Sequence, residues 1–267
     1  ATKYPQKVII NEVGPRDGLQ NEDQTITLEN KIKLVNLLVK SGLKSIEVGS
    51  FVSPKWVPQM ADSLELIHAL ELHNNNEVTF SALVPNLKGL ASAVKSRVPR
   101  IAIFASASET FSKKNINCSI EESLDRFTEV VLEAQQYNLQ IRGYVSCAFG
   151  CPYEGEISTN NVVSVSEKLL QLGCYEVAIS DTNGVGTPDQ TKLIIEELSE
   201  SLPIERIAMH MHDTRGRAIE NIQIALSYGI SSIDASVAGL GGCPYAPGSS
   251  GNVCLLYTSD AADELCS

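Results

Sequence analysis

The chain has 267 residues, 43% of them hydrophobic and 20% charged, and its formal net charge is -11. This length and balance predict one large core in a single domain, since an α/β barrel commonly reaches this size. The acidic balance argues against nucleic-acid binding, which needs basic groups to neutralise phosphates. No apolar run approaches the ~20 residues of a membrane span, and no secretory leader opens the chain. We therefore expect no nucleic-acid partner and no membrane partner.

Seven cysteines are scattered along the chain. An odd number in a long α/β chain is typical of reduced thiols rather than of a disulfide framework. Cys147 and Cys151 do not have Cys-x-x-Cys spacing, and no second pair accompanies them. The sequence therefore gives little reason to expect a structural zinc or redox site there.

Short apolar strands alternate with helical segments along the chain. Strands are predicted at residues 8–12, 45–48, 78–83, 100–104, 141–147, 175–180, 207–212 and 232–237. Such alternation indicates βα units around a parallel sheet. Eight units match a (β/α)₈ or TIM barrel better than an open doubly wound sheet of five or six strands.

The predicted helices carry their own boundary signals. Apolar residues at helical spacing lead up to Gly42 and to Gly229, and glycine favours helix termination. Ser119 and Glu122 have the spacing of a capping box ahead of another helix, and Thr187 opens a further helix in the same way. We interpret these residues as packing and capping groups.

Polar residues gather at the carboxyl ends of the predicted strands, which in a barrel share one mouth. They are Arg16 and Asp17 after the first strand, Glu47 in the second, Asp181 after the sixth, His210 and His212 in the seventh, and the segment 239–245 after the eighth. Ionisable groups from distant parts of a sequence rarely converge by chance. This convergence predicts an active site at the mouth.

His210 and His212 indicate half of a metal site. Alternate residues of a strand share a face, so both imidazoles should face the barrel interior while the neighbouring methionines face the helices. Asp17 and Asn252 are the best further donors. Two imidazoles, a carboxylate and an amide oxygen suit Mg²⁺ or Mn²⁺ and could hold Zn²⁺. A His-x-His pair alone could merely end an interior strand, but the convergence at the mouth favours the metal site.

Long motifs narrow the interpretation further. They are residues 12–22 (EVGPRDGLQNE), 50–60 (SFVSPKWVPQM), 113–123 (KKNINCSIEES), 143–147 (GYVSC), 150–155 (GCPYEG), 181–188 (DTNGVGTP) and 237–246 (VAGLGGCPYA). Through these motifs the chain resembles the 3-hydroxy-3-methylglutaryl-CoA lyases from about residue 8 to residue 252. The wider superfamily, which includes isopropylmalate and homocitrate synthases, shares the barrel, the Arg-Asp pair and the His-x-His pair. Residues 50–60 and 239–245 resemble the lyase branch in particular.

The resemblance implies a divalent-metal-dependent retro-Claisen cleavage of (S)-3-hydroxy-3-methylglutaryl-CoA to acetyl-CoA and acetoacetate, with Mg²⁺ or Mn²⁺ as cofactor. The cation ligands that it implies are Asp17, His210, His212 and Asn252. Arg16 would bind substrate and stabilise the enolate oxygen of the departing thioester. Cys243 would take part in catalysis by protonating the acetyl-CoA carbanion. From the residues alone, an inert thiol is the simpler reading of a loop cysteine.

Two carboxylates are assigned supporting roles by the same resemblance. Glu47 and Asp181 are expected to orient the substrate, a metal-bound water or His210. The base that takes the hydroxyl proton is either His210 or Asp181. A buried carboxylate near a cation could equally be structural.

The phosphates of the coenzyme need cations. Lys55, Lys113 and Lys114 are candidates because they lie in loops that are expected at the mouth. A lysine pair is more often only a solvated face. Trp56, the single tryptophan, is interpreted as packing rather than as a stacking surface.

The likeness to the family ends after Asn252. Residues 1–252 are the predicted catalytic barrel, and residues 253–267 are interpreted as an atypical tail, a foreign or truncated junction that leaves the barrel without its last full helix and C-terminal helical region. The tail could disturb the position of Asn252. We expect a homodimer in the cytoplasm, with the mitochondrial matrix as the alternative because eukaryotic family members commonly work there.

Two other functions stay open. One is a Claisen-condensing synthase of the same superfamily, which would join an acyl-CoA to an α-keto acid. Such enzymes usually carry additional carboxy-terminal domains, and residues 50–60 argue against this reading. The other is a catalytically dead, truncated barrel that only binds acyl-CoA or a partner subunit.

Overall fold

The computed structural model describes residues 4–71, 77–243, 246 and 248–255. In this part of the chain eight parallel strands close into a barrel, each pairing with the next in chain order and the last with the first. The strands are β1 (Ile9–Glu12), β2 (Ser45–Ser50), β3 (Thr79–Leu83), β4 (Arg100–Ser106), β5 (Gln140–Ser146), β6 (Glu176–Asp181), β7 (Ile207–Met211) and β8 (Ser232–Ala235). The predicted (β/α)₈ barrel is confirmed, with strand ends that agree to within two residues.

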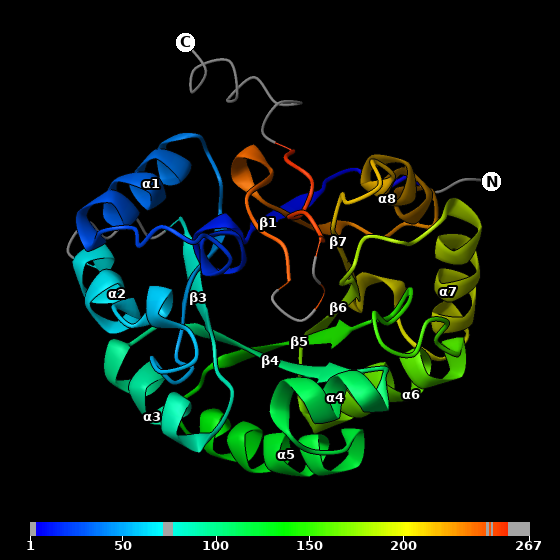
Figure 1. Cartoon of the computed structure of the whole chain (residues 1–267), viewed down its shortest axis with the longest axis horizontal. Helices are drawn as coiled ribbons and strands as arrows, with labels where there is room; N and C mark the ends of the chain where they lie inside the picture. The colour runs from blue at the N-terminus through cyan, green and yellow to red at the C-terminus, as the bar shows by residue number, and fades with distance from the viewer. Residues whose placement is uncertain (1–3, 72–76, 244–245, 247, 256–267) are drawn as a thin grey trace.

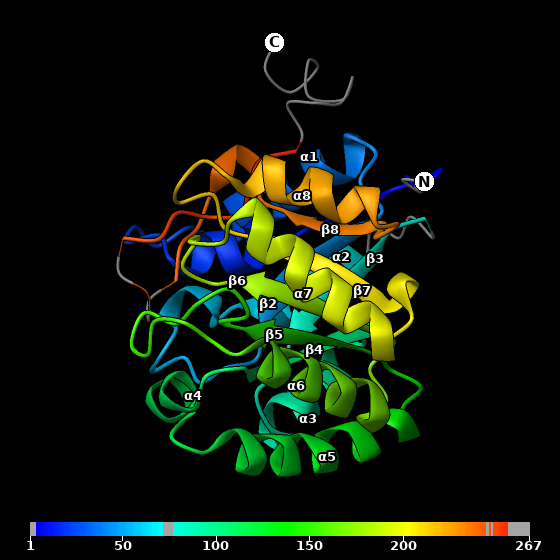
Figure 2. The same cartoon turned by 90° about the vertical axis from the view of Figure 1, so that its right-hand side faces the viewer.

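The helices form a ring outside the strands (Figure 1). They are α1 (Leu28–Lys40), α2 (Ser63–Glu71), α3 (Leu87–Ser96), α4 (Glu109–Ile116), α5 (Ile120–Gln136), α6 (Thr159–Leu172), α7 (Pro188–Ser201) and α8 (Ala218–Ser227), with short turns η1 (Gly14–Gly18), η2 (Pro58–Met60), η3 (Ile204–Arg206) and η4 (Val237–Gly239). Two helices follow β4, and the extra one, α4, lies with the loops at one end of the barrel (Figure 2).

The predicted helix boundaries are present. Ser119 and Glu122 form a reciprocal capping box at the start of α5, and Thr187 and Gln190 form another at the start of α7. Both boxes satisfy backbone N–H groups that have no partner inside the helix. The predicted packing and capping roles of these residues are confirmed.

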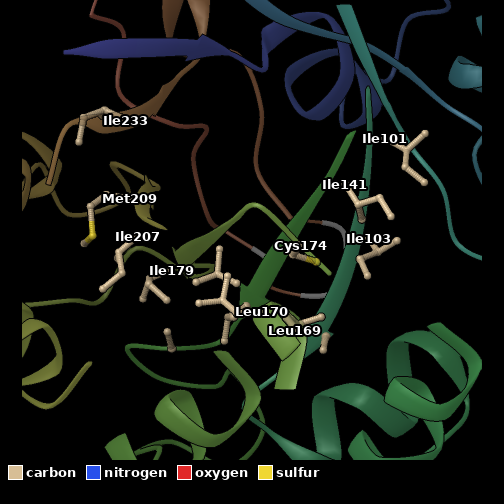
Figure 3. Packing of buried hydrophobic residues seen from close by; sticks show 14 of the residues in the cluster. Ile101, Ile103, Ile141, Leu169, Leu170, Cys174, Ile179, Ile207, Met209 and Ile233 are labelled. Atoms are coloured by element: carbon tan, nitrogen blue, oxygen red, sulfur yellow. The ribbon is translucent and has the colours of Figure 1, made fainter. Parts of the chain in front are cut away.

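The strands have two faces with different chemistry. Outward-facing isoleucines and Met209 pack against the helices in the main core (Figure 3). Met211 belongs to the same core. A second cluster, made of Leu83, Ala102, Tyr144, Ala178 and Ala208, lies inside the barrel. Because residues along a strand alternate between faces, His210 shares the interior with Ala208, as predicted.

The chain after β8 folds back across the mouth of the barrel. Val253 N donates to Met211 O at 3.3 Å and Asp213 N donates to Gly251 O at 2.9 Å, so this segment runs beside the end of β7. Residues 256–267, which make up most of the predicted tail, lie outside the described residues. Among the helices described, none has the length and apolar character needed to cross a bilayer.

Candidate active site

A tight turn after β1 places the first two polar residues. The N–H groups of Arg16, Asp17 and Gly18 all donate to the carbonyl of Val13, which closes η1 on itself. Gly14 fits because it has no Cβ, which would lie 2.5 Å from Glu12 Oε1. The turn directs Arg16 and Asp17 into the mouth, where both line one cavity.

Three predicted ligands converge at the base of that cavity. The donor atoms of Asp17, His210 and His212 lie within 4.8 Å of one another. Asp17 Oδ2 is 3.5 Å from His210 Nε2 and 3.6 Å from His212 Nε2, and the two imidazole nitrogens are 3.2 Å apart. Nitrogen and carboxylate oxygen at these separations could surround one cation.

Asn252 completes the cluster. Its backbone pairs with that of His212 in an antiparallel bridge, which brings its amide to the histidines. The amide nitrogen lies 3.2 Å from Asp17 Oδ2 and 3.2 Å from His210 Nε2, while the buried oxygen Oδ1 has no hydrogen-bond partner among the described residues. Turning the amide by 180° would place Oδ1 where the nitrogen now lies, beside Asp17 Oδ2 and His210 Nε2. The four residues therefore fit a divalent cation.

The far nitrogens of both imidazoles have acceptors. His210 Nδ1 donates to Asp234 Oδ2 at 2.8 Å, and His212 Nδ1 donates to the carbonyl of Ser250 at 2.7 Å. These bonds leave the Nε2 lone pairs directed at the centre when the imidazoles are neutral, an orientation typical of metal-binding histidines.

The role of Asp234 at the site was not predicted from the sequence. An aspartate inside an otherwise apolar strand could have indicated it. Its side chain is fully buried, and Arg142 donates to both oxygens, at 3.0 and 2.7 Å. Burial raises the pKa of Asp234, but Arg142 and His210 outweigh burial and lower it to about 2. The carboxylate is therefore ionised and holds His210 in place.

The cluster stabilises positive charge at its centre. Burial alone lowers the pKa of His210, but hydrogen bonds to Asp17 and Asp234 raise it to about 9. Burial likewise raises the pKa of Asp17, and the charge of Arg16 with the two histidine bonds brings it well below its usual range. A cation at the centre would take the place of that imidazolium proton.

Arg16 is held by a buried network that includes Glu47. Its Nε donates to Glu47 Oε1, its Nη1 donates to Asp17 Oδ1 at 2.9 Å, and its guanidinium lies 5.5 Å from the ring centre of Tyr144. Tyr144, whose role was also missed from the sequence, donates its hydroxyl to Glu47 Oε2 at 3.0 Å. Glu47 therefore fixes Arg16. It is not one of the described residues that line the cavity.

Asp181 lies just behind the cavity wall. Its neighbours Ser180 and Thr182 line the cavity, whereas its own oxygens accept the N–H groups of Val185 at 3.0 Å and Gly186 at 2.8 Å. Burial raises the pKa of Asp181, partly offset by these backbone bonds. Asp181 thus shapes the loop after β6, and it would need a bridging water to reach substrate.

The cavity has a volume of about 600 Å³ and extends from the ligand cluster to α4. Lys114 lines its rim, with Nζ 4.0 Å from the ring centre of Tyr153, whereas the exposed Lys113 is not part of the described lining. Trp56 also lines the rim and is 81% exposed. The prediction that Trp56 is packing was therefore wrong.

Cys243 is half-buried and lines the cavity. It packs against a buried cluster that contains Phe111, Cys147 and Cys151, and its N–H donates to Ser249 Oγ at 2.9 Å. The last two residues of the predicted 239–245 loop lie outside the described residues.

Comparisons with known proteins agree with this geometry. The family model HMGL-like matches residues 7–262. A Pseudomonas aeruginosa protein named 3-hydroxy-3-isohexenylglutaryl-CoA/hydroxy-methylglutaryl-CoA lyase is 53% identical over 93% of this chain and 82% of its own. The human protein named hydroxymethylglutaryl-CoA lyase, mitochondrial, is 50% identical over 93% of this chain and 76% of its own.

Solved structures give the same result. The crystal structure of hydroxymethylglutaryl-CoA lyase from Pseudomonas aeruginosa has a TM-score of 0.92 and 51% identity, covering 98% of this chain and 87% of that one. An HMG-CoA lyase from Acinetobacter baumannii, in complex with coenzyme A and 3-methylmalate, has a TM-score of 0.91 at 36% identity, covering 100% and 86%. The carboxyl transferase domain of Rhizobium etli pyruvate carboxylase, at 17% identity and a TM-score of 0.70, shares the fold alone.

Fold and site together define a (β/α)₈ barrel with a His-x-His cluster at its mouth that could hold a metal ion. Within that class, the match over most of the length shows that the chain belongs to the HMGL-like family, whose named relatives here are lyases.

Proposed function

We propose that the chain is a hydroxymethylglutaryl-CoA lyase. It cleaves 3-hydroxy-3-methylglutaryl-CoA to acetyl-CoA and acetoacetate. The observation that carries this proposal is the convergence of Asp17, His210, His212 and Asn252 below the cavity, in a chain about half identical to named lyases along most of its length. The reaction belongs to leucine breakdown and ketone-body formation.

The cation that this cluster suits is Mg²⁺ or Mn²⁺, held by Asp17, His210, His212 and Asn252. When bound, it would polarise the hydroxyl oxygen of the substrate and stabilise the charge that develops there. Asp234 and the carbonyl of Ser250 keep the two imidazoles aligned for this task.

Arg16 binds the substrate thioester and stabilises the enolate oxygen as the carbon-carbon bond breaks. A buried guanidinium is always charged, and its planar fork presents several donors in fixed directions. Glu47 occupies Nε, and Asp17 takes a bond from Nη1. The guanidinium nevertheless lines the cavity, so its remaining N–H groups can reach the thioester oxygen.

Two further groups handle protons. Both ring nitrogens of His210 are engaged when it serves as a ligand, so Asp181 is the better candidate for the base that takes the hydroxyl proton, through one water. Burial raises the pKa of Asp181, so its carboxylate holds a proton more strongly than an ordinary aspartate does. Cys243, on the cavity wall, donates a proton to the acetyl-CoA carbanion.

The coenzyme end of the substrate extends toward α4. Lys114 on the rim and Lys113 beside it supply positive charge for its phosphates. Relatives are named for the mitochondrion and for the cytoplasm, and we assign this chain to the cytoplasm. A homodimer stays a prediction that sedimentation of the purified protein would test.

One assay tests the proposed activity. Purified protein is treated with a chelator, dialysed, and given 3-hydroxy-3-methylglutaryl-CoA with or without Mn²⁺, and acetoacetate is measured. We expect product only with the metal. A synthase would instead release free CoA from acetyl-CoA in the presence of an α-keto acid, and a dead barrel would bind acyl-CoA without either product.

A longer substrate is a second candidate. The Pseudomonas aeruginosa relative is also named for a 3-isohexenyl substrate. The cavity of about 600 Å³ has apolar walls formed by Leu83, Phe104 and Phe111, which would accommodate a larger apolar group at carbon 3. Comparison of kcat/KM for the methyl and isohexenyl substrates tests this, and a loss of more than about a thousandfold for the latter would exclude it.

A further inference from the structure

The segments that carry Asp17 and Cys243 are joined by one side chain, Asn21. Its amide nitrogen donates to the carbonyl of Asp17 at 2.9 Å and to the carbonyl of Gly242 at 2.9 Å. Gly242 directly precedes Cys243. A single amide group therefore holds the backbone of a metal ligand and the backbone next to the cysteine at a fixed separation.

A second side chain, Glu12, also joins these two segments, at residues that precede Asp17 and Gly242 in the chain. Glu12 is fully buried, and its Oε1 accepts the N–H of Gly14 at 2.8 Å and the N–H of Val237 at 2.8 Å. Gly14 begins η1 and Val237 begins η4. The two turns therefore share one acceptor at their starts.

Close backbone packing continues this connection. We call residues 240–243 the cysteine segment. A Cβ on Gly241 would lie 3.1 Å from Gly251 Cα and 3.3 Å from Gly18 Cα, and a Cβ on Gly18 would lie 2.9 Å from Leu240 Cβ. The cysteine segment thus lies between the backbone next to Asp17 and the backbone next to Asn252, so two ligand-bearing segments enclose it. Figure 1 shows the blue turn after β1 beside the orange-red chain after β8.

We infer that Asn21 and Glu12 are positioning residues that couple the position of the cysteine segment to the position of the metal cluster. The inference rests on the proposed function, since it assumes that Asp17 and Asn252 hold a cation. Neither Asn21 nor Glu12 is one of the described residues that line the cavity, so both act through the segments that they join. When the cation fixes Asp17 and Asn252, the bonds of Asn21 fix Gly242 and hence the thiol of Cys243.

The reactivity of Cys243 toward iodoacetamide reports on its position without turnover. Cys118, Cys147, Cys151 and Cys174 are buried, and peptide mass mapping separates Cys243 from the remaining cysteines. We expect saturating Mn²⁺ to change the alkylation rate of Cys243 in the unsubstituted protein at least threefold. In Asn21→Ala that change should shrink below 1.5-fold, kcat should fall about 10- to 100-fold, and Mn²⁺ affinity should stay within about threefold.

Asn161→Ala is the matched control. Its amide donates to the carbonyl of Ala107 at 3.3 Å, at the start of α6 and outside the described cavity lining. It should keep the Mn²⁺ effect on Cys243 and the kcat. Should Asn21→Ala not fold, Asn21→Ser is measured in its place.

The outcomes separate the two proposals. If Mn²⁺ does not bind the unsubstituted protein by paramagnetic resonance titration, the proposed function fails. If Mn²⁺ binds but leaves the alkylation rate of Cys243 unchanged, or if Asn21→Ala keeps both the Mn²⁺ effect and the kcat, the positioning role of Asn21 is overturned.

Discussion

The metal cluster has two halves that are held in different ways. His210 lies on β7, and behind it stands a buried network in which Asp234 bonds Arg142, and Arg142 bonds Glu176 at 2.6 Å. Asp17 instead lies on the turn η1, and Asn252 lies on the returning segment that is bridged to His212. Hydrogen bonds and glycine packing hold both against residues 240–242. Strand hydrogen bonds and ion pairs fix the first half before any ligand arrives, whereas the second half depends on contacts between segments distant in sequence.

The two halves therefore contribute different groups to the site. The strand half supplies the two imidazole nitrogens, and the loop half supplies the carboxylate, the amide and the cysteine. Stable sites are usually built on strands, and loops carry the groups that adjust. Substitutions in the two halves should therefore have separable effects.

The largest effect is expected from Asp17→Asn, which removes the only carboxylate among the four proposed ligands. Mn²⁺ affinity and kcat/KM should each fall about a thousandfold or more, because a neutral amide replaces the main counter-charge to the cation. Calorimetric titration and acetoacetate assays measure the two losses. Asp62→Asn, which removes an ion pair with Lys31 outside the described cavity lining, is the control and should change neither. Retained Mn²⁺ binding in Asp17→Asn would mean that the loop half is not a ligand.

Asp181→Asn should lower kcat about a hundredfold while leaving Mn²⁺ affinity nearly unchanged. The physical reason is loss of the proton acceptor. Burial raises the pKa of Asp181, so its ionised form is lost at a higher pH than for an ordinary aspartate, and kcat of the unsubstituted protein should fall as pH drops through that raised value. The variant should lack this acidic limb in a pH-rate profile. An identical limb in the variant would assign the base elsewhere.

Asp234→Asn should reduce Mn²⁺ affinity and kcat/KM by about 10- to 100-fold, because His210 loses the carboxylate that orients it. The free energy of unfolding should also fall, by about 3 kcal/mol, since Arg142 loses a buried ionic partner. Denaturant unfolding and metal titration measure the two changes. Unchanged metal affinity alongside reduced stability would give Asp234 a purely structural part in the strand half.

The smallest effect concerns Glu12 in the loop half. Burial, opposed by its two backbone bonds, raises the pKa of Glu12 from 4.5 to about 7. The folded state therefore favours the protonated carboxyl, so this group's stabilising contribution is complete below pH 4.5 and is lost as pH rises through 7. Relative to Glu12→Gln, the unsubstituted protein should lose about 2–3 kcal/mol of unfolding free energy between pH 5 and pH 8. Parallel stability curves would contradict the burial of an ionisable Glu12.

Sequence reasoning reached the strand half more easily than the loop half. The period of two in β7 is enough to place His210 and His212 on the interior face, and the capping patterns of α5 and α7 locate those helices. Asp17 was expected at the mouth because it follows the first predicted strand. Asn252 was selected because its type suits a cation and because the sequence resembles a known family. Neither a local pattern nor composition brings those two residues together.

What sequence reasoning missed has a common cause. The bond from Glu12 to Val237 joins residues 225 positions apart, and the bond from Asn21 to Gly242 joins residues 221 positions apart. Such pairs leave no periodic signal. Trp56 was misplaced for a related reason, because exposure at the rim of a cavity depends on what the fold leaves uncovered, and the residue type alone favours burial.

The central prediction is a cation held by both halves of the cluster. A crystal structure grown with Mn²⁺, with anomalous scattering recorded near the manganese edge, tests this directly. We expect one strong peak about 2.0–2.3 Å from Asp17 Oδ2, His210 Nε2, His212 Nε2 and Asn252 Oδ1. A peak that contacts only the histidines, or no peak at the mouth of the barrel, would contradict it.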